Sequence, residues 1–228
     1  LKNNQGTFEL VYEKLYAGAN ILILAEGLTK HEKKMRPIQK GAARMVFGAY
    51  DKYEDLDAII IPVGVNYTDS DAFRSIIMVD FGEAIPVNKY YEMHGENPRK
   101  AIKKLTEEIS DAMYEHIIHI NEDEDAEFVN GLLDINRHNY DHRVLPRIDR
   151  KRGDLLQQEK QITETINKME TAPKATLREQ VMNYLAKLQK HQVTDLGVAQ
   201  RQRYSWLNSL ILLIGLLPFL IGFMGNVL

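Results

Sequence analysis

The fold is decided by two short apolar runs, Asn20-Ile-Leu-Ile-Leu-Ala25 and Ala58-Ile-Ile-Ile-Pro-Val-Gly-Val65. Neither run alternates polar with apolar residues, so each has the pattern of a strand that is buried on both faces, in a sheet covered by helices. A third run, Ser75–Phe81, has the same character and ends at Gly82. Pro62 interrupts the second run. Because proline cannot donate a ladder hydrogen bond, we expect that strand to bulge or end there.

Helical patterns surround these runs. A helix with small residues on one side is predicted over Gly41–Tyr50, and a longer one over Pro98–Ile120, where apolar residues recur at helical spacing. A short helix capped by Thr7 is predicted to end at Gly18. The alternation of strands and helices predicts an α/β fold, with a sheet flanked by helices.

The composition changes beyond residue 120. An acidic cluster over Glu122–Glu127 is typical of a helix start. The stretch Leu155–Lys190 is rich in Gln, Glu, Lys and Leu and is broken once by Pro173, which predicts one or two long amphipathic helices. We therefore expect three parts: a sheet-containing domain over 1–120, a charged helical extension over 121–200 and an apolar segment over 204–228.

The apolar segment carries no charged residue between Tyr204 and Leu228. A helix needs about 20 such residues to cross the hydrocarbon layer, so the segment predicts a transmembrane helix, with a buried core helix as the alternative. Arg201 and Arg203 precede it, which predicts that the globular part lies on the cytoplasmic side of a membrane. Since the chain begins at Leu1 without an initiator methionine and ends without a polar flank, we expect it to be part of a longer protein.

Composition excludes several classes of protein. The 228 residues include 29 basic and 32 acidic side chains, giving a formal net charge of −3. That balance provides no global positive field, so no nucleic acid partner is expected. The chain has no cysteine, which excludes a disulfide framework, a thiolate metal site and a thiol nucleophile.

Two further patterns concern histidine pairs and a basic run. His138 and His142 are spaced like metal ligands, and His116 and His119 nearly so, but no carboxylate or cysteine set completes a zinc site, and no metal is predicted. The basic run Arg143–Arg152 either contacts anionic lipid headgroups or pairs with nearby acidic residues.

The end of the first apolar run gathers residues that suit an anion. Ligands collect at the carboxyl ends of strands in open α/β sheets, and a helix N-terminus adds backbone amides and a favourable dipole. The run is followed by a carboxylate, a glycine and then several cations before the next helix: Glu26, Gly27, Lys30, Lys33, Lys34, Arg36, Lys40 and Gly41. This spacing predicts a phosphate site, with a charged surface loop as the alternative.

The stretch Leu22–Ala43 resembles the third conserved block of the glycerolipid acyltransferases, the family of lysophosphatidate and glycerol-3-phosphate acyltransferases. That block reads Phe-Pro-Glu-Gly-Thr-Arg-Ser and is followed by a helix that starts with a Lys-Gly-Ala-like sequence. Ile59–Val65 resembles the fourth block, a hydrophobic strand with an embedded proline. Residues 1–120 therefore resemble the second half of that acyltransferase domain. The remainder resembles a helical extension with a membrane anchor.

The resemblance implies that a fatty acyl group passes from acyl-CoA or acyl-carrier protein to glycerol 3-phosphate or lysophosphatidate, beside membrane lipids and without a cofactor. It implies a substrate-binding role for seven residues: Glu26, Gly27, Thr29, Lys30, Lys40, Gly41 and Pro62. Two positions depart from the family pattern. Ala25 stands where the family has proline, and Thr29 stands where it has a phosphate-binding arginine. Lys30 supplies a point charge there, without arginine's bidentate geometry.

The catalytic pair of that family is His-x-x-x-x-Asp, in which the histidine deprotonates the acceptor hydroxyl. None of the seven histidines has aspartate five positions later. His119 with Glu124 comes nearest, but it follows the third-block match instead of preceding it. We therefore expect this chain to bind substrate without turning it over alone. The alternatives are a membrane-tethered adaptor, in which residues 154–190 recruit a partner, and a relative that binds phospholipid without acylating it.

Overall fold

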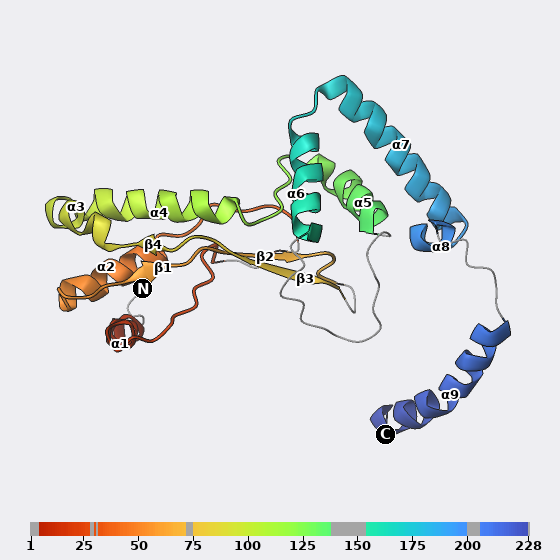
Figure 1. Cartoon of the computed structure of the whole chain (residues 1–228), viewed down its shortest axis with the longest axis horizontal. Coiled ribbons are helices and arrows are strands. Elements are labelled where there is room, and N and C mark those ends of the chain that lie inside the picture. The colour runs from red at the N-terminus through yellow and green to blue at the C-terminus, as the bar shows by residue number, and fades with distance from the viewer. Residues whose placement is uncertain are drawn as a thin grey trace.

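A computed structural model of the chain describes residues 5–27, 30, 32–71, 75–137, 154–199 and 206–227. These residues form a mostly helical structure with two small two-stranded sheets (Figure 1). In chain order the elements are α1 (Gln5–Tyr16), α2 (Gly41–Lys52), β1 (Ile59–Ile60), β2 (Val63–Tyr67), β3 (Ile77–Phe81), β4 (Ile85–Pro86), η1 (Asn88–Tyr90), α3 (Tyr91–Glu96), α4 (Pro98–Tyr114), η2 (Asp123–Asp125), α5 (Ala126–Arg137), α6 (Asp154–Asn167), α7 (Thr171–Lys190), α8 (Asp195–Ala199) and α9 (Trp206–Val227).

Pro62 divides the second apolar run as the sequence predicts. β1 ends at Ile60, β2 begins at Val63, and the two strands take different partners: β1 pairs antiparallel with β4, and β2 pairs antiparallel with β3. The carbonyl oxygen of Pro62 accepts a hydrogen bond of 2.9 Å from the backbone N–H of Gly82. The third apolar run forms β3, so both of these strand predictions are confirmed.

The strand predicted over Asn20–Ala25 is wrong. These residues join no ladder, and Leu22 and Leu24 are 86% and 77% exposed. A strand forms only where a neighbouring strand pairs with its backbone groups, and no described strand lies alongside this run. The α/β expectation is therefore confirmed only in part: strands and helices are both present, but the described residues contain two-stranded sheets instead of a sheet covered on both faces.

The helix predictions agree with the structure more closely than the strand prediction for residues 20–25. α2 covers the predicted range and extends it to Lys52. α4 begins where expected, with Asn97 accepting a hydrogen bond from the Lys100 N–H and Pro98 in the first turn, but it ends at Tyr114 instead of Ile120. It ends early because the following residues bond to β2.

The remaining predicted helices differ in detail. α1 already includes Thr7, so this residue does not cap it. The stretch after residue 154 forms two helices, and the break lies at residues 168–170. Pro173 instead occupies the first turn of α7, where a missing N–H costs nothing.

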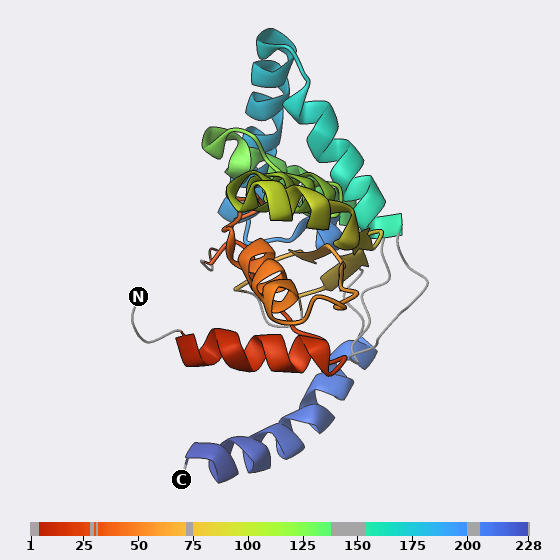
Figure 2. The same ribbon diagram turned by 90° about the vertical axis from the view of Figure 1, so that its left-hand side faces the viewer.

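Two main hydrophobic cores hold the molecule together. The first joins α2, β1, β4 and α4 around Phe47, Val87 and Leu105, and the second joins α5, α6 and α7 around Phe128 and Leu133. In Figure 2, α6 and α7 rise on one side of α4, while α1 lies on the other. The predicted division at residue 120 stays a prediction.

Asn66 clamps the segment after α4 to the sheet. Its side chain is buried on β2, its Nδ2 donates to the carbonyl oxygen of His116 at 2.9 Å, and its Oδ1 accepts from the N–H of Ile118 at 2.8 Å. These two bonds substitute for a strand ladder, satisfying backbone groups that would otherwise be buried unpaired. Gly64 makes the approach possible, because a Cβ there would lie 2.5 Å from the carbonyl carbon of His116.

A buried ion pair joins the helical part to the β2–β3 hairpin. Arg137, at the end of α5, donates to both carboxylate oxygens of Glu159 on α6, at 2.5 and 2.9 Å, and to the carbonyl oxygen of Thr68 at 3.2 Å. It also pairs with Asp134. Glu159 is fully buried and Arg137 is 7% exposed. A buried ion pair of this kind is stable only when the hydrogen-bonding groups of both charged side chains are paired.

The predicted apolar segment forms α9, with Tyr204, Ser205 and Leu228 outside the described residues. Among the described residues, no helix combines the length and the apolar character needed to cross a membrane. The predicted transmembrane span is therefore not found.

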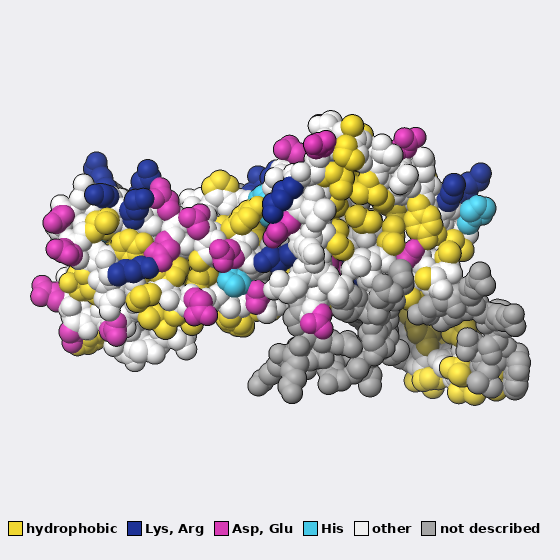
Figure 3. Space-filling view, turned by 45° about the horizontal axis from the view of Figure 1, so that its top comes forward, with side chains coloured by type: hydrophobic (Ala, Val, Ile, Leu, Met, Phe, Trp, Pro, Cys, Tyr) yellow, Lys and Arg dark blue, Asp and Glu magenta, His cyan; other side chains and the backbone are white. Residues whose placement is uncertain are grey.

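Charge is evenly mixed on the outer side of α4. In Figure 3, basic and acidic side chains are interspersed over this part of the molecule. Lys103 and Lys104, for example, both pair with Glu107.

Replacing Gly64 with alanine tests the close approach of the two backbones. We expect Gly64→Ala to lower the free energy of unfolding by at least about 2 kcal/mol, because the methyl group must displace the His116 backbone. Urea denaturation followed by circular dichroism measures it. Gly95→Ala is the matched control, since a Cβ there meets nothing within 4 Å. Equal stability of both variants would refute the close approach.

Replacing Glu159 with glutamine tests the buried ion pair. We expect Glu159→Gln to lower the free energy of unfolding by about 3 kcal/mol, because Arg137 would keep a buried charge without its main partner. Glu164→Gln, which breaks the exposed pair with Lys168, should change it by less than about 0.5 kcal/mol. Similar values for the two variants in urea denaturation would contradict the assignment.

Candidate functional site

The Glu26–Gly27 turn lies against the start of α2. The N–H of Gln39 donates to the carbonyl oxygen of Ala25 at 2.8 Å, and a Cβ on Gly27 would lie 3.4 Å from the Gln39 side chain. Gly27 has a φ of 69°, a left-handed conformation that favours glycine. The structure thus brings Glu26 and Gly27 beside Lys40 and Gly41, where α2 begins.

The Glu26 carboxylate faces the following loop. Partial burial raises its pKa, the negative charge of Glu32 acts in the same direction, and a backbone hydrogen bond from Arg36 partly offsets both. The side chain is half-buried. The Glu26 carboxylate therefore helps to hold the loop in shape. Its exposed part remains accessible beside the loop.

Three cations of the loop already have partners. Lys33 donates to the carbonyl oxygen of Thr68 at 3.0 Å, Lys34 pairs with Asp123 at 2.7 Å, and Arg36 pairs with Glu32. Burial lowers the pKa of Lys33, and the nearby Arg137 adds to this effect. These three side chains hold the loop in place.

Lys30 and Lys40 differ from the other loop cations, because both side chains are exposed. Lys30 lies near enough to Glu32 and Asp123 to help lower the pKa of each carboxyl. Lys40 directly precedes α2, and open space lies in front of Gly41, where a Cβ would meet nothing within 4 Å. An anion at this helix start would meet backbone N–H groups and the Lys40 ammonium. Thr29 lies outside the described residues.

The loop is fastened to the segment that follows α4. The N–H of Ile120 donates to the carbonyl oxygen of Lys33 at 2.8 Å, and the N–H of Met35 donates to Nδ1 of His119 at 3.0 Å. Burial lowers the pKa of His119, and the charge of Lys34 lowers it further. The neutral ring therefore carries its proton on Nε2. Sequence reasoning missed this contact, since His119 is 84 residues from Met35 and no pattern links them.

Pro62 lies apart from this turn. It is fully buried between β1 and β2, and its described hydrogen bond goes to Gly82. Its geometry is that of a strand break, and its substrate-binding role stays a prediction.

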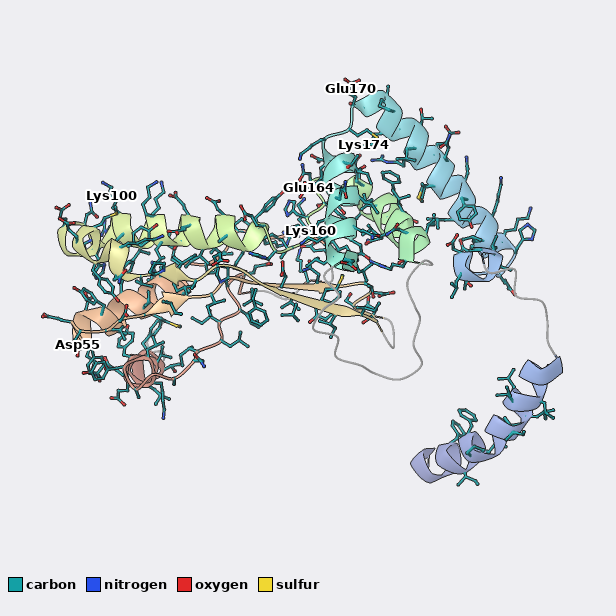
Figure 4. All side chains as sticks on the ribbon, in the orientation of Figure 1. Asp55, Lys100, Lys160, Glu164, Glu170 and Lys174 are labelled. Carbon is teal, nitrogen blue, oxygen red and sulfur yellow. The ribbon has the colours of Figure 1, made fainter. Side chains whose placement is uncertain are left out.

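A hollow of about 320 Å³ opens at the junction of α4 and α6. Tyr114, His119, Lys160 and Glu164 are among its lining residues, and Figure 4 shows the last two along α6. Lys160 donates to the carbonyl oxygen of Glu115. The hollow adjoins the His119 side of the loop, and the Glu26–Gly27 turn does not line it.

Two histidine–aspartate pairs form between segments far apart in the sequence. Nδ1 of His116 lies 2.8 Å from Asp80, and Nε2 of His94 lies 2.8 Å from Asp51. The ring of His94 is buried and stacks on Phe47, with centroids 4.3 Å apart, which fits a structural role. Neither pair has the His-x-x-x-x-Asp spacing, which no histidine of this chain has.

In the described part of the chain, no group of three or more His, Asp or Glu side chains comes together as metal ligands. His138, His142 and the basic run Arg143–Arg152 lie outside that part.

Known proteins give a partial match. No protein-family model and no solved structure matches the chain. Glycerol-3-phosphate O-acyltransferase 2 of Saccharomyces cerevisiae is 30% identical over 113 residues, and glycerol-3-phosphate O-acyltransferase 1 of the same yeast is 34% identical over 106 residues. A protein of Schizosaccharomyces pombe described as an uncharacterized acyltransferase is 29% identical over 105 residues.

The matches cover about half of this chain and a small part of each relative. They cover 49%, 45% and 45% of this chain, but 15%, 14% and 16% of the respective relatives. About half of the chain is therefore homologous to part of the yeast glycerol-3-phosphate O-acyltransferases. The chain spans about one seventh of their length.

The His119 contact predicts a pH-dependent stability. Because the folded pKa lies below the unfolded value of about 6.5, the unfolded chain binds more protons between those two values. This contribution to stability is complete above pH 6.5 and is lost as the pH falls towards the folded pKa. In His119→Asn the amide oxygen still accepts from Met35, so the variant should lose this pH dependence while remaining folded. Urea denaturation between pH 5 and pH 8 measures it, and identical pH profiles for the two proteins would contradict the contact.

Proposed function

We propose that this chain is part of an enzyme that moves a fatty acyl group from acyl-CoA or acyl-carrier protein to glycerol 3-phosphate or lysophosphatidate, in phospholipid synthesis. The partial homology to the yeast acyltransferases carries this proposal. The Glu26–Gly27 turn beside the start of α2 supports it, since that arrangement suits a phosphate-bearing acceptor.

In the proposed complex the acceptor phosphate lies in front of α2. Lys40 and Lys30 supply positive charge, the first-turn N–H groups of α2 donate to the phosphate oxygens, and Gly41 leaves room for their approach. Glu26 keeps the loop in position through the Arg36 backbone. Thr29 lacks the positive charge of the family's arginine, so Lys30 takes that role.

The chemical step needs a base that the turn does not supply. The acceptor hydroxyl oxygen attacks the thioester carbonyl carbon, the C–S bond breaks, and the hydroxyl proton passes through the base to the departing thiolate. We propose that a histidine outside this chain performs that proton transfer and that an aspartate orients its ring. The chain alone would then bind the acceptor without turnover.

We also propose that the reaction takes place at a membrane, with the globular part on the cytoplasmic side. The acylated product is a membrane lipid, and the acyl donor arrives from the cytosol. Exposed apolar side chains along α9 support this location, because they would leave water on contact with lipid. Membrane lipids are then neighbours of the enzyme as well as its products.

Replacing Lys40 in the full-length enzyme tests the phosphate site. We expect Lys40→Ala to raise the KM for glycerol 3-phosphate about tenfold, because a charge-assisted hydrogen bond to the phosphate is lost. Lys100→Ala is the matched control, since Lys100 is an exposed lysine at the far end of α4 (Figure 4). Radiolabelled acyl transfer to glycerol 3-phosphate and to lysophosphatidate measures both variants. An unchanged KM for both acceptors in Lys40→Ala would refute the site.

A further inference from the structure

One face of the β2–β3 hairpin is apolar and uncovered. Three cross-strand pairs lie on it: Val63 with Phe81, Val65 with Val79, and Tyr67 with Ile77. Ile59 and Ile61 extend the same face towards β1. We call these eight side chains the open face. All of them except the half-buried Val63 are between 44% and 68% exposed.

The other face of the same hairpin is covered. Gly64, Asn66 and Met78 are buried, and the segment after α4 packs over them. The hairpin is therefore packed on the face that carries Asn66, whereas its apolar face remains open. Monomeric proteins rarely leave a contiguous apolar patch of this kind in water, and such patches mark interaction surfaces.

Most of the described helices are already engaged elsewhere. α1 packs on α2, where Tyr12 lies against Gly48, and α2 and α4 share the first core. α5, α6 and α7 share the second core, and α8 contacts α5.

Among the described helices, α9 exposes the most apolar surface. It carries no charged residue, and side chains around its circumference are 60% to 74% exposed: Ile211, Leu212, Leu213, Ile214, Phe219 and Ile221. Figures 1 and 2 agree in placing α9 on the side of the hairpin opposite α4. Since the segment after α4 packs over the covered face, α9 lies on the side of the open face.

The two surfaces have matching dimensions. Nine residues from Ile59 to Tyr67 extend about 30 Å at the rise of a strand, and the 22 residues of α9 extend about 33 Å at the rise of a helix. Two paired strands present a surface about 10 Å wide, close to the diameter of one helix. A single helix therefore suffices to cover the open face.

The connection to α9 starts near one end of that face. α8 packs on α5, and Arg137 at the end of α5 reaches Thr68, next to the end of β2. From Ala199 to Trp206 the chain spans at most about 24 Å. The start of α9 would thus lie over Tyr67 and Ile77, and its end would lie towards Ile59.

We propose that the open face is the docking surface for α9 of the same chain in aqueous solution. Burying these side chains against each other removes apolar area from water on both partners. Docking on the hairpin and contact with lipid are then alternative positions for one helix. This inference does not depend on the acyltransferase reaction.

The absence of cysteine allows a direct test. Val79→Cys places one thiol on the open face of the full chain, and Lys104→Cys places one on the exposed side of α4, where the lysine side chain is 56% exposed. We expect a water-soluble maleimide to label the first thiol at least about tenfold more slowly than the second, which corresponds to a docked population above 90%. Adding Leu213→Lys to the Val79→Cys chain should abolish this protection, because a lysine in α9 cannot be buried on an apolar face.

Four outcomes would overturn the proposal. Equal labelling rates for the two thiols would show that nothing covers the open face. Protection that survives both Leu213→Lys and a second variant, Phe219→Lys, assigns the cover to something other than α9. Protection accompanied by a doubled mass in light scattering assigns it to a second copy, and protection that appears only with phosphatidylcholine vesicles assigns it to lipid. Circular dichroism confirms that each variant remains folded.

Discussion

The whole arrangement depends on Asn66. A two-stranded hairpin is only marginally stable alone, and here the buried Asn66 side chain ties β2 to the segment that follows α4. The same segment continues to His119 and Ile120, which hold the loop that begins after Gly27. One amide thus links the sheet, the end of α4 and the candidate phosphate loop. Gly64 is required for this link because no side chain fits between the two backbones.

Much of the local structure was predictable from the sequence. The break at Pro62 follows from its missing N–H, and the start of α4 follows from Asn97 and Pro98, so these features are local and were predicted correctly. The strand over residues 20–25 was predicted wrongly because its formation depends on a pairing partner, which no local pattern specifies. The early end of α4 was missed for a similar reason, since it is set by a hydrogen bond to Asn66, 52 residues away from Ile118.

The candidate site was predictable only as a set of residues. The sequence placed Glu26, Gly27, Lys40 and Gly41 in one loop, and the structure brings them to the start of α2. The sequence alone does not indicate which of the loop cations already form ion pairs or hydrogen bonds. Asp123, which the sequence placed in an acidic cluster typical of a helix start, pairs with Lys34. The result is a loop in which most of the charge serves to hold its shape, and the exposed lysines near its ends are the ones best placed to meet an anion.

The division of the strands at Pro62 has a consequence for self-association. Because each described sheet has only two strands, every one of those strands has an outer edge with backbone groups directed away from its partner. Pro86 in β4 and Pro62 beside β1 blunt the smaller sheet, since neither residue can donate a hydrogen bond. The β2–β3 hairpin has no such protection along its five-residue ladder. At high protein concentration, any growth of a shared sheet between molecules would therefore begin along the β2–β3 edges.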